Sequence, residues 1–290
     1  MFINSFKGNE TVRLSLEESI KSSKLSHAVL IFAKEGCGAN YFAKLLAADI
    51  IGADADGLQL INSDANGQVQ TVRGSGASGQ IKVDSVRMIN DNVNFSSIGG
   101  EKRVVIIENC ENLNKSSANA LLKNLEEPKD DITYILTALD GSAVLATIRS
   151  RCQSFTLSQP SIGQCKEYFA DCTSGKKDEL IKIYNGNIGM VKAALQTPQR
   201  LEILQKAIDA RKFINSADWY ALAKMMFSFN KKKEDFILFL KDTEYIFDSN
   251  FDACSAAVLN AVMEAKSALE RNANLALVLE NFIILIKNRL

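Results

Sequence analysis

The run Ala28-Val-Leu-Ile-Phe-Ala33, followed at once by Lys34-Glu-Gly-Cys-Gly-Ala-Asn40, carries the strongest structural signal in the chain. A short continuous run of apolar residues predicts a strand buried on both faces of a parallel sheet. Two further runs of this kind occupy residues 104–107 and 132–136, and the first two runs are followed by apolar residues at helical spacing. This alternation predicts an α/β domain with a parallel, doubly wound sheet.

Glycine and proline divide the chain into three predicted domains. No glycine follows Gly189, and glycine-free sequence with helical periodicity predicts an all-helical region. Pro160 and Pro198 lie between segments of different character and mark two boundaries. We therefore expect an α/β domain at 1–158, a small helical domain at 159–197 and a helical domain at 198–290.

Local signals refine the first domain. The helical run before Pro128 should end there, and Asn114 is a plausible N-cap for the same helix. Residues 54–80 are polar and contain five glycines, so we expect a loop around one strand at 58–61.

The composition argues against several classes of protein. The 290 residues include 34 Lys+Arg and 34 Asp+Glu, and a protein that grips DNA alone through many phosphate contacts needs a basic excess. No segment has the apolar length that spans a bilayer, and residues 1–10 lack a signal peptide's apolar run, so we expect a cytoplasmic protein with no membrane partner. The six cysteines and the single His27 do not cluster, so we expect free thiols and no metal site.

The turn after the first predicted strand has the context of a nucleotide-binding phosphate loop without its chemistry. Such a loop reads G-x-x-x-x-G-K-[ST] between a strand and a helix. Aligned on Gly38, the chain keeps that glycine and has Gly36 inside the loop. Ala33, Ala39 and Asn40 replace the first glycine, the lysine and the hydroxyl residue. Alanine cannot supply the charge that meets the phosphates, and asparagine is a poor substitute for the hydroxyl that ligates Mg²⁺.

The second predicted strand ends in a similar alteration. In ATPases this strand ends in Asp-Glu, where Asp holds the metal and Glu activates water. Here Glu108 and Asn109 follow residues 104–107, so a carboxylate remains and the water-activating position carries an amide. A generic βα turn with no relation to nucleotides is the plain alternative. Two altered elements in the correct order favour a lapsed ATPase over that alternative.

At this point the sequence resembles the AAA+ subunits of bacterial DNA polymerase clamp loaders. Four stretches carry the resemblance, which covers roughly residues 1–160: Leu25-Ser-His-Ala-Val-Leu-Ile-Phe32, Val104-Val-Ile-Ile-Glu-Asn-Cys-Glu-Asn-Leu113, Ser117-Ala-Asn-Ala-Leu-Leu-Lys-Asn-Leu-Glu-Glu-Pro128 and Ala146-Thr-Ile-Arg-Ser-Arg-Cys152. The third and fourth are highly specific in combination. The resemblance implies a RecA-like AAA+ core, a small helical lid and a helical collar through which subunits assemble.

The resemblance also implies function and partners. Subunits of this family that hydrolyse ATP, gamma/tau, keep an intact phosphate loop, so this chain resembles a member that neither hydrolyses ATP nor needs a cofactor. It would assemble with gamma/tau and delta subunits. That assembly opens the β sliding clamp and places it on primed DNA.

Individual roles follow from the same resemblance. Arg151, within Ser150-Arg151-Cys152, matches an arginine that the family presents to ATP bound by the neighbouring subunit. Thr137 matches the sensor-1 position, and Met190 occupies the sensor-2 position where active members carry arginine. Many members hold zinc on four cysteines between the phosphate loop and the second strand, and residues 38–109 contain none.

Alternatives stay open for these residues and for the whole chain. Arg151 in isolation reads as a surface arginine or as the partner of a nearby carboxylate, and Arg149 competes for its role. Glu126 and Glu127 point to different helix faces and more simply end a helix than form an acid pair. Besides a non-hydrolysing loader subunit, we consider a weak AAA+ ATPase and an AAA+-derived scaffold outside replication.

Overall fold

The computed structural model describes residues 1–75, 79–94, 101–128, 131–139, 141–248 and 253–289, and the chain forms two compact units. One unit consists of Met1–Tyr168 together with the short segment Asn187–Gly189. The other consists of Phe169–Gly186 and Met190–Leu290. The predicted division into three domains, with boundaries at residues 158 and 197, stays a prediction.

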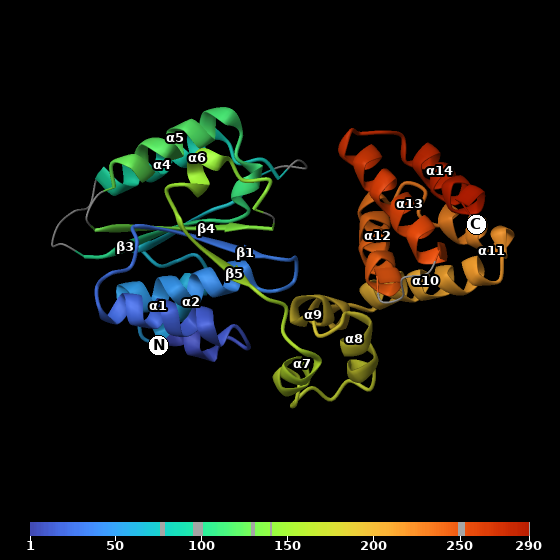
Figure 1. Ribbon diagram of the computed structural model, residues 1–290, viewed down its shortest axis with the longest axis horizontal. Helices are drawn as coiled ribbons and strands as arrows, with labels where there is room; N and C mark the ends of the chain where they lie inside the picture. Colours follow the sequence, from blue (N-terminus) through green and yellow to red (C-terminus); the bar gives the residue numbers. More distant parts are fainter. Residues whose placement is uncertain (76–78, 95–100, 129–130, 140, 249–252, 290) are drawn as a thin grey trace. The chain divides into compact units, whose positions relative to one another are not determined.

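The first unit is built on a five-stranded parallel sheet with the order β2-β3-β4-β1-β5 (Figure 1). Its strands are β1 (Ala28–Ala33), β2 (Val69–Val72), β3 (Arg103–Ile107), β4 (Ile132–Ala138) and β5 (Gln153–Leu157). The three strands predicted from continuous apolar runs are confirmed as β1, β3 and β4. In the register, Ile135 of β4 lies between Val29 of β1 and Ile106 of β3, so these runs form the centre of the sheet.

Helices cover both faces of this sheet, as Figure 1 shows. On one face lie α1 (Glu10–Lys21) and α2 (Ala39–Ile51), and on the other lie α4 (Val83–Asn94), α5 (Lys115–Glu126) and α6 (Ala146–Arg149). Alternate residues of β1 serve the two cores, because Ile31 packs with residues of α2 and Leu30 with residues of α5. Burial on both faces is the reason that β1 is continuously apolar. Shorter elements are η1 (Phe2–Ser5), α3 (Ala55–Asn62), η2 (Cys110–Asn112) and α7 (Ile162–Tyr168).

The strand predicted at residues 58–61 is wrong, because this segment belongs to helix α3. Asp54 caps the helix by accepting a hydrogen bond from the first turn at 2.8 Å. Leu58 and Ile61 lie three residues apart and pack into one core cluster, which is the spacing of a helix. The strand of this polar region is β2, which lies later in the chain and pairs with β3 at the sheet edge.

The limits of α5 agree with the sequence signals. The side chain of Asn114 accepts a hydrogen bond from the backbone N–H of Ser117 at 2.8 Å, which satisfies one free donor at the helix start. The helix ends at Glu126, two residues before Pro128. The predicted N-cap and the predicted end are both confirmed.

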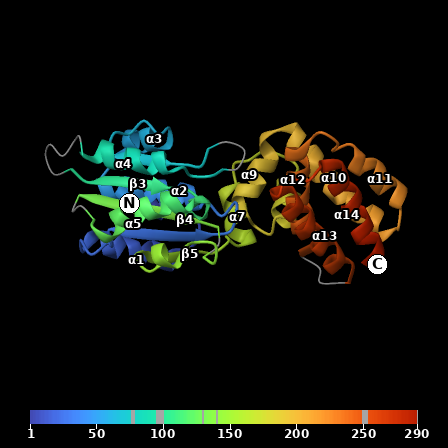
Figure 2. The same cartoon turned by 90° about the horizontal axis from the view of Figure 1, so that it is seen from above.

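The second unit is helical in its described residues, as the absence of glycine after Gly189 predicts. Its helices are α8 (Lys177–Ile183), α9 (Ile188–Gln196, whose first two residues belong to the other unit), α10 (Pro198–Asn215), α11 (Trp219–Phe227), α12 (Lys233–Asp248), α13 (Ala253–Glu270) and α14 (Leu275–Arg289) (Figures 1 and 2). Phe229, Phe236, Phe239 and Phe282 meet at its centre, with ring centroids 5.1 to 6.2 Å apart. These aromatic contacts join α12 to α14 and to the turn after α11.

A buried polar cluster ties three helical segments of the second unit together. Arg200 in α10 forms an ion pair with Asp242 in α12, and both side chains are buried. The hydroxyl of Tyr184, at the end of α8, donates to Asp242 Oδ1 at 2.8 Å, and Arg200 Nη2 donates to the same hydroxyl at 3.2 Å. A buried charge is tolerated only when it is paired and hydrogen-bonded, so each member of this cluster depends on the others.

We expect Asp242→Asn to lower the free energy of unfolding of the second unit by about 3–5 kcal/mol, because Arg200 then stays buried without an opposite charge. Tyr184→Phe is the matched control, since it removes the two hydrogen bonds of the hydroxyl but leaves the ion pair, and costs about 1–3 kcal/mol. The single tryptophan, Trp219, lies in α11, so urea unfolding followed by its fluorescence reports on this unit. Identical unfolding curves for Asp242→Asn and the unchanged chain would contradict this role.

Candidate functional site

The candidate site lies at the carboxyl edge of the sheet, where the loops after β1, β3 and β4 meet. These three strands are parallel neighbours in the order β3-β4-β1, so their carboxyl ends share one edge. The structure brings together Asn40, Glu108, Asn109 and Thr137 there, as the sequence pattern predicts. Met190 lies in α9 of the other unit and is buried.

The side chain of Asn40 is hydrogen-bonded at both ends of its amide. Its Oδ1 accepts from the hydroxyl of Thr137 at 2.7 Å, and its Nδ2 donates to Glu108 Oε2 at 3.2 Å. The backbone N–H of Asn109 in turn donates to Thr137 Oγ1 at 3.0 Å. Asn40, Glu108 and Thr137 therefore form one hydrogen-bonded group. They stand at the positions where the sequence predicts the metal ligand, the acidic strand end and the sensor.

A cation that the sequence reasoning missed completes this arrangement. The guanidinium of Arg73, which follows β2, donates to both carboxylate oxygens of Glu108, from Nε at 2.9 Å and from Nη2 at 3.0 Å. The same group donates to both oxygens of Asp64, at 2.5 and 3.2 Å. Lys44 Nζ lies 3.1 Å from Asp64 Oδ1 and provides a second positive charge. Bidentate pairs of this kind are stronger than single hydrogen bonds.

These contacts shift the ionisation of the groups involved. Hydrogen bonds from Arg73, and then from Lys44, lower the pKa of Asp64 to about 2, against the opposing effect of burial. The carboxylates of Glu108 and Asp64 raise the pKa of Arg73. Arg73 therefore remains a fixed positive charge between two carboxylates.

The glycines of the phosphate loop lie against side chains of the same chain. Gly36 and Gly38 have positive φ values of 78° and 83°, a conformation that favours glycine. A Cβ atom on Gly36 would lie 2.2 Å from Asn187 Oδ1, and one on Gly38 would lie 3.1 Å from the ring of Phe6. Asn187 Nδ2 also donates to the carbonyl of Glu35 at 2.8 Å. Protein atoms thus fill the space beside both glycines.

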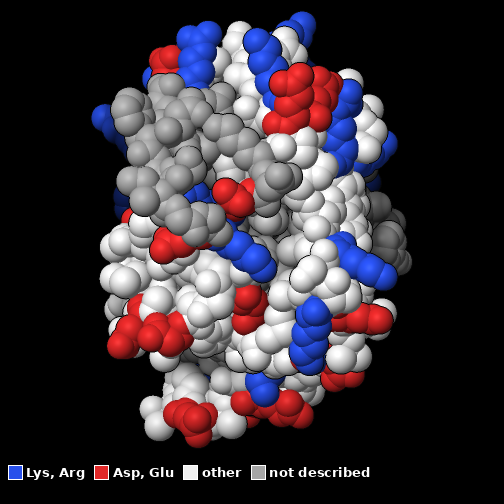
Figure 3. All heavy atoms as spheres, turned by 90° about the vertical axis from the view of Figure 1, so that its left-hand side faces the viewer, with Lys and Arg blue, Asp and Glu red and all other residues white. Residues whose placement is uncertain are grey.

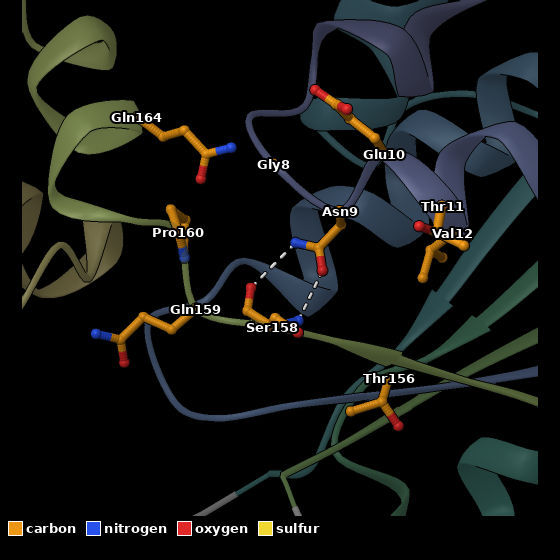
Figure 4. A pocket seen from close by; sticks show the side chains of 10 residues that line it. All are labelled: Gly8, Asn9, Glu10, Thr11, Val12, Thr156, Ser158, Gln159, Pro160 and Gln164. Carbon is orange, nitrogen blue, oxygen red and sulfur yellow. Dashed lines mark hydrogen bonds between the residues drawn. The ribbon is translucent and has the colours of Figure 1, made fainter.

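A polar hollow of about 440 Å³ lies elsewhere in the first unit (Figure 4). It is lined by residues 8–12, at the start of α1, together with Thr156, residues 158–160 and Gln164. Asn9 makes two hydrogen bonds with the backbone of Ser158, at 3.0 and 2.6 Å, and Gln164 Oε1 accepts from the N–H of Ser161 at 3.0 Å. The amide side chains of Asn9 and Gln164 are therefore already paired, and none of the predicted site residues lines this hollow.

The loop Ser150–Cys152 follows α6 and leads into β5. Arg151 Nη2 lies 2.6 Å from Glu126 Oε1, and Arg151 Nη1 donates to the carbonyl of Thr147 at 2.9 Å. Glu126 ends α5, as the sequence predicts, and it also binds Arg151. Cys152 packs against the core cluster between the sheet and α5. Burial raises the pKa of its thiol to about 11, so the thiol is neutral at neutral pH.

The described residues hold neither a metal-binding cluster nor a membrane-spanning helix. Among the described residues, no three His, Cys, Asp or Glu side chains gather as a possible metal-binding group. No helix within the described ranges is long and apolar enough to cross a bilayer. On the face of the molecule in Figure 3, the basic and acidic side chains of the described residues are interspersed.

The parallel sheet, the two-glycine loop and the altered acidic strand end define an α/β core of the AAA+ class. A family model described as "DNA polymerase III, delta subunit" matches residues 8–161, more than half of the chain. The chain belongs to this family, a clamp-loader branch of the AAA+ proteins.

Similar proteins agree with this assignment. DNA polymerase III subunit delta' of Haemophilus influenzae is 32% identical over 199 residues, which are 64% of this chain and 59% of that protein. Subunit delta' of Escherichia coli is 26% identical over 221 residues, 71% of this chain and 66% of that protein. Subunit tau of Bacillus subtilis is 29% identical over 213 residues, 69% of this chain and 37% of that protein. The matched region of this chain thus spans only part of each of these relatives.

The fold also has a solved counterpart. The crystal structure of a DNA polymerase III gamma subunit-related protein from Thermotoga maritima superposes with a TM-score of 0.62. The superposition covers 94% of this chain and 99% of that chain at 17% identity. This likeness supports the architecture, namely a parallel α/β core followed by helical regions.

The contacts of Arg73 and Lys44 with Asp64 predict how the free energy of unfolding depends on pH. The pKa of Asp64 is about 2 in the folded chain and about 3.9 in an unfolded one. Its carboxylate therefore stabilises the fold fully above about pH 4, and this contribution is lost as the pH falls through about 2. We expect Asp64→Asn to flatten the acid limb of the stability curve.

The measurement is urea unfolding followed by circular dichroism between pH 2 and pH 5. Asp84→Asn is the matched control, because Asp84 is an exposed carboxylate that lies 3.9 Å from Arg87. If the free energy of unfolding falls with the same slope below pH 4 in the Asp64→Asn and Asp84→Asn variants, the stabilising role of Asp64 is contradicted.

Proposed function

We propose that the chain is a non-hydrolysing subunit of a DNA polymerase III clamp loader. The observation that carries the proposal is the mutual pairing of Asn40, Glu108, Thr137 and Arg73 at the edge where an ATPase holds metal and phosphate. The printed names of the relatives, DNA polymerase III subunits delta' and tau, support the replication context.

For each step of ATP hydrolysis, the group that the step needs is either absent from this chain or already paired. Ala39 leaves no ammonium to meet the β- and γ-phosphates. Glu108 is engaged with both Arg73 and Asn40, so a Mg²⁺ ion would have to displace a bidentate guanidinium. Asn109 carries an amide, which cannot take a proton from the attacking water. The proposal therefore includes no nucleotide cofactor and no catalysis within the chain itself.

We expect the isolated chain to bind Mg·ATP with a Kd weaker than about 1 mM, which corresponds to about 4 kcal/mol. Titration with a fluorescent ATP analogue measures this, with an intact gamma/tau subunit as positive control. Arg73→Ala should not restore binding, because Ala39 and Asn109 remain. Saturable binding in the micromolar range would favour the alternative function, a weak AAA+ ATPase.

Arg151 is the residue through which such a subunit contributes to chemistry. Phosphoryl transfer spreads negative charge over the γ-phosphate oxygens, and a guanidinium supplied by a neighbouring subunit stabilises that charge. Arg151 is partly exposed in a loop at the end of α6, with 35% of its side chain accessible. We propose that it acts in trans on ATP bound by an adjacent gamma/tau subunit.

We expect Arg151→Ala to leave folding and assembly intact and to lower the ATPase rate of the loader in the presence of clamp and primed DNA. One arginine finger is worth about three to five orders of magnitude at its own site, and the remaining sites of the assembly mask part of this loss. Arg149→Ala is the matched control, because this arginine donates only to the carbonyl of Gly141, at 3.3 Å, in the described contacts. Equal rates for the Arg151→Ala and unmodified loaders would remove the trans role and leave a scaffold.

The second unit offers a surface for assembly with gamma/tau and delta subunits. Tyr220 and Phe227 in α11 are 80% and 72% exposed and lie seven residues apart on one helix face. Together with Ala223, Lys224 and Ser228 they line an open hollow of about 540 Å³. Exposed aromatic residues of this kind mark protein contacts more often than free surface. Through this assembly the subunit would act on the β sliding clamp and primed DNA.

We expect the double variant Tyr220→Ser, Phe227→Ser to weaken co-purification with gamma/tau and delta while leaving the melting temperature nearly unchanged. Leu14→Ser is the control, since Leu14 is a similarly exposed apolar residue in α1 of the other unit. Undiminished assembly of the double variant would refute the contact. Co-purification of the untagged chain with partners unrelated to replication would favour the remaining alternative, an AAA+-derived scaffold outside replication.

A further inference from the structure

Arg151 has a partner inside its own chain that the proposed trans role does not explain. Its Nη2 lies 2.6 Å from Glu126 Oε1, and its Nη1 donates to the carbonyl of Thr147 at 2.9 Å. Glu126 is the last residue of α5 and Thr147 lies in α6. Two neighbouring helices therefore hold one guanidinium, through a carboxylate on one side and a backbone carbonyl on the other.

The position of Glu126 explains why it takes a cation. A carboxylate in the last turn of a helix lies near free backbone carbonyls and at the negative end of the helix dipole, which disfavours it. A guanidinium at 2.6 Å offsets that repulsion. Glu127, the next residue, is exposed and carries the same charge, and the ion pair is made by Glu126.

The pair is exchangeable rather than structural. The side chains of Arg151 and Glu126 are 35% and 49% exposed, and ion pairs this open to water contribute only about 0–1 kcal/mol. Such a contact does not hold a fold together, but it biases the position of a long side chain. A phosphate offers the same guanidinium an acceptor of equal or better geometry.

We propose that Glu126 holds Arg151 on its own subunit and thereby restrains ATP hydrolysis by the neighbouring subunit until the loader meets clamp and DNA. This inference rests on the proposed trans role of Arg151. The Nη2 group that pairs with Glu126 is one of the donors that a γ-phosphate would use, so the two acceptors compete. Glu126 is thus a positioning residue, and its removal increases the fraction of Arg151 that is available to the neighbour.

The test uses the complete reconstituted loader and measures its ATPase rate without clamp and DNA. We expect Glu126→Gln to raise this basal rate about two- to fivefold, which is the effect of losing about 0.4–1 kcal/mol of holding energy at 1.36 kcal/mol per tenfold change. Glu126→Lys, which repels Arg151, should raise the rate at least as much. Glu127→Gln is the matched control and should leave the rate unchanged.

Two further readouts separate this role from a structural one. The difference in basal ATPase rate between the Glu126→Gln and unmodified loaders should shrink as the salt concentration is raised. Salt screens the attraction between Glu126 and Arg151, so the unmodified loader then holds Arg151 less tightly. The double variant Glu126→Gln, Arg151→Ala should show the same low rate as Arg151→Ala alone, since Glu126 acts only through that arginine. Melting temperatures and gel filtration show that each variant still assembles.

The outcomes distinguish failure of this inference from failure of the proposed function. If Arg151→Ala lowers the stimulated rate while Glu126→Gln behaves like Glu127→Gln, only the restraint by Glu126 is wrong. If Glu126→Gln lowers the basal rate, Glu126 supports the finger instead of holding it back, and the inference is overturned. If neither Arg151→Ala nor Glu126→Gln changes any rate, the trans role itself fails and the restraint fails with it.

Discussion

The guanidinium of Arg73 binds two carboxylates at one edge of the sheet, and the loops at this edge depend on this interaction. Arg73 follows β2, Glu108 follows β3, and Asp64 lies between α3 and β2. Glu108 is buried, so without a nearby cation the two carboxylates would repel each other in poorly solvated surroundings. The cation of an ATPase site is a bound metal ion, whereas this chain supplies a positive charge from its own sequence. The edge strand β2 is thereby joined to the centre of the sheet by charge as well as by backbone hydrogen bonds.

The elements predicted from the sequence are those whose signal is local and long enough. β1, β3 and β4 are continuously apolar because they are buried on both faces, and α5 has a capping residue at its start and a proline beyond its end. β2 has only four residues at the sheet edge, so it leaves no comparable pattern. The segment around Leu58 mixes apolar and polar residues in a way that suits a strand or a helix, and the cap at Asp54 decides between them in the folded chain.

The candidate site shows the same division between local pattern and tertiary contact. Asn40, Glu108 and Thr137 could be placed together in advance because parallel neighbouring strands end at one edge. Arg73 lies 35 residues from Glu108 in the chain and stands in no motif. Asn187 lies 152 residues from the loop carbonyl that it binds, and its place three residues before Met190, the sensor-2 position, does not predict that contact. The partner of Arg151 escaped prediction for a related reason, since a helix-ending glutamate has no sequence feature that names its cation.

Under the proposed function, the reciprocal pairing at the sheet edge would make ATP hydrolysis difficult to gain for any descendant of this sequence. Ala39→Lys would add an ammonium at the residue before Asn40, whose partner Glu108 is already paired with Arg73. Asn40→Thr would remove the amide donor to Glu108, and Asn109→Glu would add a negative charge before any metal is present to bind it. Each substitution alone disturbs an arrangement that is already satisfied and yields no catalysis by itself. Under the proposed function, single substitutions would therefore disturb these contacts before any of them gains catalysis, and the paired residues at the sheet edge would act as an evolutionary ratchet.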